Sequence, residues 1–268
     1  MMNRNILDAV RAVYEKKPLV HSITNFVVMQ VSANALLAAH ASPLMAHAAE
    51  EMDDLTTIDD ALVLNIGTLD PDWLASMELA GSLMKKKGKP VVLDPVGAGA
   101  SALRTRSALR LLDMVRPDIL RGNASEIMAL ASEIRSADRV LTKGVDSRNE
   151  SAEAVASARE LAARFSCTVS VSGETDFITD GRDTFAVEGG SPLMPLVTGM
   201  GCSASAVTGA YAACAPSLVA ACAAMAVMAS AGEKAGKKAS GPGSFLPAFL
   251  DELYLLDAGD AARRVRRA

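Results

Sequence analysis

The turn Gly199-Met200-Gly201-Cys202 is the part of the sequence with the clearest capacity for chemistry. It precedes a neutral, Ala-rich and Ser-rich segment at 203–213 that is expected to be helical. Glycines let the backbone bend and leave its N–H groups accessible, and a helix start carries a partial positive charge. Such a turn can hold a phosphate or the charge that develops in phosphoryl transfer, although a packing turn rich in glycine has the same composition.

Cys202 could act as a nucleophile, as a proton acceptor or as a small packed residue. Helix N-termini lower the pKa of a thiol, which predicts a reactive side chain. A phosphatase-type cysteine needs an arginine that closes its loop, and none follows here. A cysteine hydrolase needs a histidine partner, and the sequence does not place His21, His40 or His47 beside this thiol. We therefore expect Cys202 to accept a proton from the hydroxyl of a kinase substrate, or to position that hydroxyl.

Two other phosphate-binding patterns fit the sequence poorly. Gly199, Gly201 and Ala204 match the loose dinucleotide pattern G-x-G-x-x-A, but that pattern needs an acidic residue about twenty positions further on for the ribose. No acidic residue occurs there before Glu233. The stretch 232–238 has glycines and lysines like a Walker loop, but its spacing is wrong and no Ser or Thr directly follows its lysines.

Asp94 and the pair Asn123 and Glu126 offer oxygen atoms to a cation. Magnesium usually takes one or two carboxylates together with waters and phosphates. At a helix start, residues three positions apart share a face, so Asn123 and Glu126 would lie together. The alternative for Glu126 is a capping-box acid, because N-x-x-E is close to that pattern. The alternative for Asp94 is a turn before Pro95.

These residues fall at the ends of predicted strands. Apolar runs at 61–66, 90–93, 118–120 and 167–172 predict strands, and helical patterns separate them. This alternation predicts an α/β fold with a mostly parallel central sheet flanked by helices, and Asp-Gly at 180–181 predicts an antiparallel edge hairpin. Ligands bind at the carboxyl ends of strands in open α/β sheets. Small and polar residues gather at those ends: Ser22, Thr24, Asn25, Asn65, Gly67, Asp94, Gly97, Gly99, Arg121, Asn123, Glu126, Ser172, Gly173, Glu174 and 199–202.

Length and composition narrow the class of protein. The 268 residues, half of them apolar, suffice for one large aliphatic core, and we expect a single domain over 1–268. The net charge is −4 without a basic stripe, so no nucleic-acid partner is expected, and we interpret the basic run at 263–267 as a solvated helix end. Four scattered cysteines without a CxxC pair favour a reducing compartment, the cytoplasm.

One stretch, between Glu188 and Glu233, contains no charged residue. A membrane span is one interpretation of it. The stretch is rich in Ala, Gly and Ser, however, and Pro216 interrupts it. Alanine contributes little insertion energy compared with leucine or phenylalanine. We therefore expect buried helices near 202–213 and 217–235, and no membrane association.

Taken together, the motifs resemble the hydroxyethylthiazole kinase family. The similar segments span nearly the whole chain in order, and as a set they are far more specific than GxGC or NxxE alone. They are PLVHSITNFVV (18–28), ASPLMAHAAEEM (41–52), LVLNIGTL (62–69), LDPVGAG (93–99), ILRGNASEIMALA (119–131), KGVDS (143–147), VSGETDFITDG (171–181), GMGCSASA (199–206) and GPGSFLPAFLDEL (241–253).

The resemblance implies a ribokinase-like fold and a reaction. ATP, with Mg²⁺, would phosphorylate the primary alcohol of 4-methyl-5-(2-hydroxyethyl)thiazole in thiamine salvage. Met45 and Gly199 match residues that contact the thiazole, and Asn25 matches an asparagine near its pocket. Cys202 occupies the place where related sugar kinases carry a catalytic aspartate. The N–H groups of 199–202 would face the transferred group.

The resemblance also implies a nucleotide site, a metal site and an assembly. Arg121 and Ser172 match nucleotide-binding positions, and we expect Asn123 beside them. Asp94 and Glu126 match the metal and phosphate end of the site. The family forms trimers with the substrate pocket at a subunit interface, so a homotrimer is expected.

Two departures and three alternatives accompany this interpretation. Family members commonly have Thr at the positions of Met200 and Ser172; serine keeps the hydroxyl, but Met200 lacks one and retains only its backbone N–H as a phosphate ligand. The alternatives are a kinase of the same fold for another vitamin alcohol, such as a pyrimidine or pyridoxal kinase, a non-catalytic thiazole-binding or nucleotide-binding protein, and a thiol hydrolase.

Overall fold

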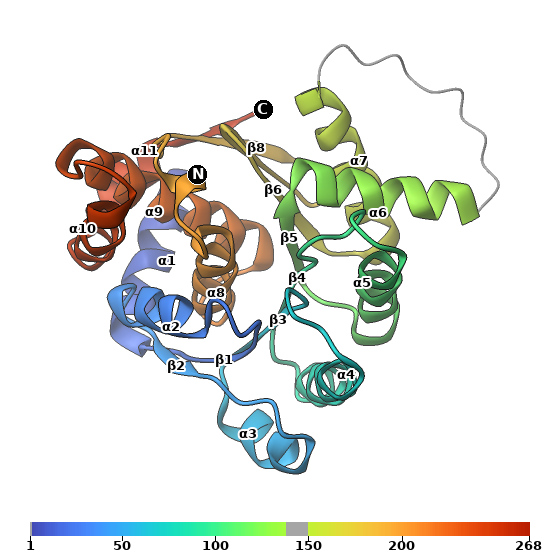
Figure 1. Ribbon diagram of the computed structural model, residues 1–268. Helices are drawn as coiled ribbons and strands as arrows, with labels where there is room; N and C mark the ends of the chain where they lie inside the picture. Colours follow the sequence, from blue (N-terminus) through green and yellow to red (C-terminus); the bar gives the residue numbers. More distant parts are fainter. Residues whose placement is uncertain (1, 138–149) are drawn as a thin grey trace.

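The structure is a computed structural model that describes residues 2–137 and 150–268 (Figure 1). Two segments lie outside the described residues: the short apolar pair at 140–141, whose sequence is compatible with a loop or a strand fragment, and the family-like segment at 143–147. Within the described chain, one sheet of nine strands runs through the molecule in the order β2-β1-β3-β4-β5-β6-β7-β8-β9. The strands are β1 (Leu19–Ile23), β2 (Ser42–Leu44), β3 (Ala61–Asn65), β4 (Val91–Asp94), β5 (Ile119–Asn123), β6 (Thr168–Ser172), β7 (Thr175–Thr179), β8 (Thr184–Glu188) and β9 (Val265–Arg267).

Six neighbouring strands, β2 to β6 in sheet order, are parallel, and β7, β8 and β9 continue the sheet in antiparallel pairs. Every residue of β3 and β4 is buried. Their near-continuous apolar sequences, ALVLN and VVLD, suit strands that are covered on both faces. The expected α/β class, with a mostly parallel sheet and an antiparallel edge hairpin, is confirmed.

Helices cover both faces of the sheet, as Figure 1 shows. One face carries α3 (Met52–Ile58), α4 (Pro71–Lys86), α5 (Ala102–Val115), α6 (Ala124–Ala137) and α7 (Glu150–Phe165). The other carries α1 (Met2–Lys16), α2 (Met29–Ala38), α8 (Met200–Ala212), α9 (Ser217–Lys238), α10 (Pro242–Tyr254) and α11 (Ala258–Arg263). Two short 3₁₀ turns, η1 (Ala49–Glu51) and η2 (Met194–Leu196), complete the described elements. Two aliphatic cores result, one on each side of the sheet.

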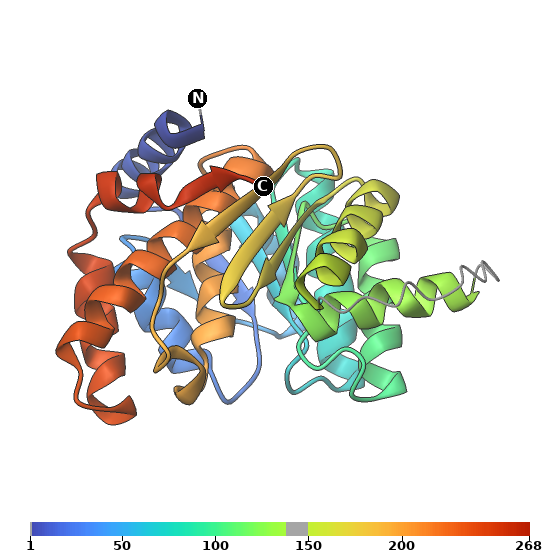
Figure 2. The same ribbon diagram turned by 90° about the horizontal axis from the view of Figure 1, so that it is seen from above.

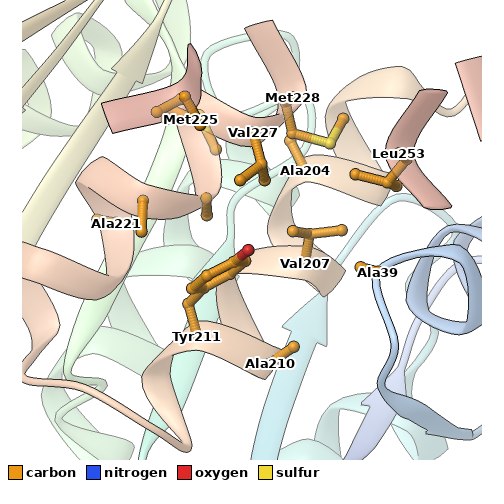
Figure 3. Close-up of a cluster of buried hydrophobic side chains, with 14 of the residues drawn as sticks. Ala39, Ala204, Val207, Ala210, Tyr211, Ala221, Met225, Val227, Met228 and Leu253 are labelled. Carbon is orange, nitrogen blue, oxygen red and sulfur yellow. The ribbon is translucent and has the colours of Figure 1, made fainter. Parts of the chain in front are cut away.

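The stretch without charges forms the central helices α8 and α9. Figure 3 shows Val207 and Tyr211 of α8 within a cluster that also contains Val227 and Met228 of α9. Small residues let these helices approach the sheet closely: a Cβ at Gly209 would lie 2.6 Å from Val63 Cγ2. Within the described chain α9 is the helix long and apolar enough to cross a membrane, but 83% of its most apolar window is buried inside the fold. This burial agrees with the prediction of a buried helix near 217–235.

The C-terminal basic run differs from its prediction. Residues 265–267 form the edge strand β9 beside β8, not the end of a helix (Figure 2). Val265 is buried in the core, and Arg266 and Arg267 are exposed. Arg266 forms an ion pair with Glu188, and Arg267 forms one with Asp183, so both charges have partners in this strand.

Candidate active site

The turn at 199–202 begins helix α8 at the carboxyl ends of the parallel strands. Gly199 has φ 91°, and a Cβ there would lie 2.6 Å from Val31 Cγ1, so glycine is required on both grounds. The first bond of the helix runs from Ser203 N to Gly199 O at 2.8 Å. The N–H groups of residues 200–202 therefore have no acceptor within the helix, as at every helix start, and they can bind an anion.

A closed ring of side chains connects this helix to three other elements. Ser205 Oγ donates to Asp94 Oδ2 at 2.7 Å, and Asn65 Nδ2 donates to the same oxygen at 2.8 Å. Asn65 Oδ1 accepts from Asn25 Nδ2 at 2.8 Å, and Asn25 Nδ2 also lies 3.5 Å from Cys202 Sγ. Cys202 and Ser205 are neighbours on one face of α8, which closes the ring. The structure thus brings together three predicted site residues, Asn25, Asp94 and Cys202. They are joined through Asn65, one of the polar strand-end residues, and through Ser205, which the sequence did not single out.

Burial dominates the electrostatics of this ring. It raises the pKa of Asp94 to about 6, against the opposing effect of Arg121 and of the hydrogen bonds from Ser205 and Asn65. Burial and the charge of Asp94 raise the pKa of the Cys202 thiol to about 11. The expectation that the helix start lowers the pKa of this thiol is therefore wrong, because burial and the neighbouring carboxylate outweigh the helix. At neutral pH Cys202 is a thiol rather than a thiolate.

Arg121 lies on β5 against the start of α8. Its side chain is almost fully buried, and its Nε finds no hydrogen-bond partner among the described residues. A Cβ at Gly201 would lie 2.9 Å from Arg121 Nη1, so the glycine makes room for the guanidinium. Leaving a buried donor unpaired costs about 1–3 kcal/mol. A buried guanidinium with an unpaired Nε beside free helix N–H groups therefore indicates an anion site.

Asn123 and Glu126 form the capping box that the sequence offered as the alternative to a cation site. Asn123 Oδ1 accepts from Glu126 N at 2.9 Å, and Glu126 Oε2 accepts from Asn123 N at 2.8 Å. Glu126 Oε1 accepts from Gly97 N at 2.8 Å. The capping role and a place near the site coexist, because these bonds fix a buried carboxylate whose charge also acts on Asp94. Each oxygen retains a second lone pair.

A cavity of about 800 Å³ opens beside this cluster. Three predicted nucleotide-binding residues line it, namely Arg121, Asn123 and Ser172, and so do Met200 and Gly201 of the turn. Met200 is buried, and its apolar side chain contributes to the wall, which gives a structural role to a residue that departs from the family pattern. The other lining residues are Gly173, Glu174, Asp176, Gly189, Gly190, Ser191, Pro192, Met194, Pro195, Ala204, Met225, Met228 and Ala229.

Most of the apolar cavity wall was not predicted from the sequence. Met225 and Met228 stand three positions apart on α9 and face the cavity together, and Met194 of η2 completes this side. Their helical spacing was a usable signal, but it also suits an ordinary core. Asp176 was also missed. It accepts from Gly173 N at 3.0 Å, and burial raises its pKa to about 6.

Met45 lies apart, immediately after the edge strand β2, and packs half-buried against the core on the face of the sheet that carries α8. The next residue is held by a buried histidine, because Ala46 O lies 3.0 Å from His21 Nε2, and His21 Nδ1 lies 2.8 Å from Asp59 Oδ2. An aromatic cluster of Phe26, Trp73 and His47 stands beside this segment, with ring centroids 4.6 and 4.8 Å apart. The sequence did not indicate that these histidine and aromatic side chains would lie beside Met45.

Comparison with known proteins shows which protein family this chain resembles. Residues 10–259 match the model of the hydroxyethylthiazole kinase family. A hydroxyethylthiazole kinase of Brachyspira hyodysenteriae is 51% identical over 265 residues, which cover 99% of this chain and 98% of the relative. One of Nitratidesulfovibrio vulgaris is 54% identical over 264 residues, which cover 98% and 96%.

Solved structures agree with these matches. The structure of a hydroxyethylthiazole kinase protein from Pyrococcus horikoshii superposes with a TM-score of 0.89 at 42% identity, covering 99% of both chains. A pyridoxal kinase from Staphylococcus aureus, in complex with AMP-PCP and pyridoxal, matches with a TM-score of 0.59 over 81% of this chain and 88% of its own. Its sequence is only 16% identical, so this match shows similarity of fold alone. The fold is ribokinase-like, and the chain belongs to the hydroxyethylthiazole kinase family.

Proposed function

We propose that this chain transfers the γ-phosphoryl group of ATP to the hydroxyl of 4-methyl-5-(2-hydroxyethyl)thiazole and forms the thiazole phosphate of thiamine salvage. The observation that carries this proposal is the anion site at the start of α8. There the guanidinium of Arg121, whose Nε has no hydrogen-bond partner among the described residues, lies against Gly201 on the wall of a large cavity. Membership of the family supplies the substrate.

ATP would occupy the cavity. Arg121 would hold the phosphates, and Asn123 and Ser172 would line the path between phosphates and ribose, since they are paired neighbours at the ends of β5 and β6. The base would lie on the apolar side formed by Met194, Met225 and others. This order would put the γ-phosphate at the N–H groups of the turn 199–202, which would stabilise the developing negative charge.

The alcohol would approach from the opposite side, between Asn25 and Met45. The Cys202 thiol would touch the reacting hydroxyl and orient it. Because its pKa is about 11, Cys202 would be protonated at neutral pH and so would not serve as the general base. A loose phosphoryl-transfer transition state makes little demand on a base, so positioning and charge stabilisation by the N–H groups would supply most of the rate.

The donor set fits a magnesium ion that arrives with ATP. The described residues contain no cluster of three or more His, Cys, Asp or Glu side chains that could hold a metal. They do contain two buried carboxylates, Asp94 and Glu126, whose charges act on each other. Mg²⁺ commonly binds through one or two carboxylates, with waters and phosphates as its other ligands. Asp94 and Glu126 would hold such a hydrated ion, which would neutralise charge on the phosphates.

A homotrimer with a shared thiazole site is part of the proposal. Asn25 is followed by Phe26 and Val27, which are 63% and 68% exposed, and Met45 follows a strand at the edge of the sheet. Apolar side chains exposed beside a substrate site suit a neighbouring subunit. Sedimentation of the pure protein at micromolar concentration should give three times 27.9 kDa. We also place the protein in the cytoplasm, where its four free cysteines would stay reduced.

The test is ADP release by the purified protein with Mg-ATP and one alcohol at a time. The thiazole alcohol should give the highest kcat/KM, and pyridoxal and a hydroxymethylpyrimidine should give far lower values. A preference for either of the other two alcohols would assign this site to another vitamin kinase. If ADP formed with no alcohol in the panel while nucleotide still bound, a non-catalytic binding protein would be the better description. Rapid labelling of Cys202 and ester hydrolysis without ATP would favour a thiol hydrolase.

A further inference from the structure

Asn65, the last residue of β3, lies at the centre of the side-chain ring and is 1% exposed. We propose that Asn65 is a positioning residue that fixes the acceptor alcohol, held by Asn25 and Cys202, relative to the Asp94 carboxylate at the phosphate end of the site. The inference rests on the proposed function, because that function assigns the two ends their ligands. Asn65 lines no part of the nucleotide cavity, so it would act only through its neighbours.

The hydrogen bonds leave the Asn65 amide a single orientation. Its Oδ1 receives two donors, Asn25 Nδ2 at 2.8 Å and Gly67 N at 3.0 Å. A flipped amide would place its own NH₂ group against both donors. Nδ2 must therefore face Asp94 Oδ2, which lies 2.8 Å away and can only accept while it is ionised. Backbone pairing supports this contact, because Asn65 and Asp94 are register partners on adjacent parallel strands.

The orientation passes on to Asn25. Asn25 Oδ1 accepts from Val27 N at 3.1 Å, so its Nδ2 must point towards Asn65 and Cys202. The backbone at Gly67 packs directly on this amide, because a Cβ there would lie 2.5 Å from Asn25 Nδ2. Asn25 is thus held from three sides, and Asn65 supplies the side-chain acceptor that secures its direction towards the thiol.

Ser205 closes the ring onto the helix that carries the phosphate-binding N–H groups. It donates to Asp94 Oδ2 one turn after Cys202 on α8. The loop after β1, the strands β3 and β4, and α8 are therefore joined by direct hydrogen bonds between buried side chains. Phosphoryl transfer depends on the distance and alignment between the alcohol oxygen and phosphorus, and a 1 Å misplacement can reduce the rate by about 100-fold. Asn65 is the member of the ring that contacts both ends.

Variants with a matched control separate this role from simple support of the fold. Asn65→Leu keeps the branched, four-atom shape of the side chain and removes all three hydrogen bonds. Asn65→Asp keeps the acceptor for Asn25 and Gly67 but turns an oxygen towards Asp94. Thr208→Val is the control, since Thr208 is equally buried on α8 and bonds only to Ala204 O, at 2.7 Å.

We expect kcat to fall by about 100-fold in both Asn65 variants, with the KM for ATP within about twofold of wild type and the Thr208→Val enzyme unchanged. A double-mutant cycle of Asn65→Leu with Ser205→Ala should be strongly non-additive, because both changes release the same carboxylate. If the Asn65 variants keep the wild-type kcat and only melt at a lower temperature, or if the cycle is additive, the proposal is overturned.

A crystal structure of the Asn65→Asp variant gives a readout that needs no activity. We expect the side chain of Asp94 to leave its present rotamer, because an oxygen now faces it, while Asn25 keeps its acceptor. An unchanged Asp94 rotamer would overturn the proposal even if the rate had dropped. A wild-type protein that does not phosphorylate the thiazole alcohol would contradict the proposed function instead. The two failures are therefore distinguishable.

Discussion

Replacement of Cys202 by alanine should slow phosphoryl transfer only modestly. Burial and the Asp94 carboxylate raise the pKa of this thiol to about 11. At pH 7.5 about 3 thiols in 10,000 are then ionised, so a mechanism that required the thiolate would forfeit more than three orders of magnitude in rate. A neutral thiol contributes one contact to the alcohol, worth about 1 kcal/mol. Its loss should lower kcat by about fivefold.

The assay is the initial rate of ADP release at saturating ATP and thiazole alcohol between pH 7 and 10. Cys202→Ala is compared with wild type and with Cys214→Ala, which removes a half-buried thiol just beyond the other end of α8. We expect a nearly flat profile for all three enzymes over this range. Two results together would refute the positioning role and establish a thiolate base: a wild-type kcat that rises tenfold per pH unit, and the absence of this pH dependence in Cys202→Ala.

Three further predictions follow from single contacts. Gly201→Ala places a Cβ 2.9 Å from Arg121 Nη1 and should raise the KM for ATP about tenfold, whereas Gly243→Ala, whose Cβ would meet nothing within 4 Å, should not; steady-state kinetics decides. Arg121→Met should weaken nucleotide binding measured by calorimetry by about 2 kcal/mol, and an unchanged Kd would remove Arg121 from the site. Asp94→Asn should abolish turnover yet stabilise the nucleotide-free protein at pH 8. Because the pKa of Asp94 is raised from 3.8 to about 6, its ionisation in the folded protein disfavours folding progressively between pH 4 and 6 and fully above. The gain at pH 8 should reach at most about 3 kcal/mol and vanish near pH 4; equal melting temperatures at pH 8 would contradict it.

The parallel sheet and the strand ends were predictable because both leave local signals. Each of these signals can be recognised from a few consecutive residues. The apolar runs predict β3 and β4, and the Asp-Gly pair predicts the hairpin. Polar residues directly after such runs then point to one edge of the sheet. Nearly all the predicted site residues that meet in the ring or the cavity were found in this way.

What the sequence could not predict depends on contacts between distant segments. Ser205 looks like any small residue of a helix until α8 is packed over β4 and the hydroxyl reaches Asp94. The pKa of Cys202 was misjudged for the same reason, because helix position is visible in the sequence and burial is not. The short strand β2 and the helix α3 were missed as well, since three residues of edge strand carry little pattern.

The most direct test of the central claim is the fate of a labelled γ-phosphoryl group. The wild-type protein is incubated with the thiazole alcohol and with Mg-ATP labelled in the γ-phosphate. The products are then separated and identified by mass spectrometry. We predict one labelled thiazole phosphate for each ADP formed, and slower formation of this product in the Arg121→Met variant at ATP concentrations below saturation. ADP accompanied by labelled inorganic phosphate alone, or labelled thiazole phosphate undiminished in that variant, would contradict the account.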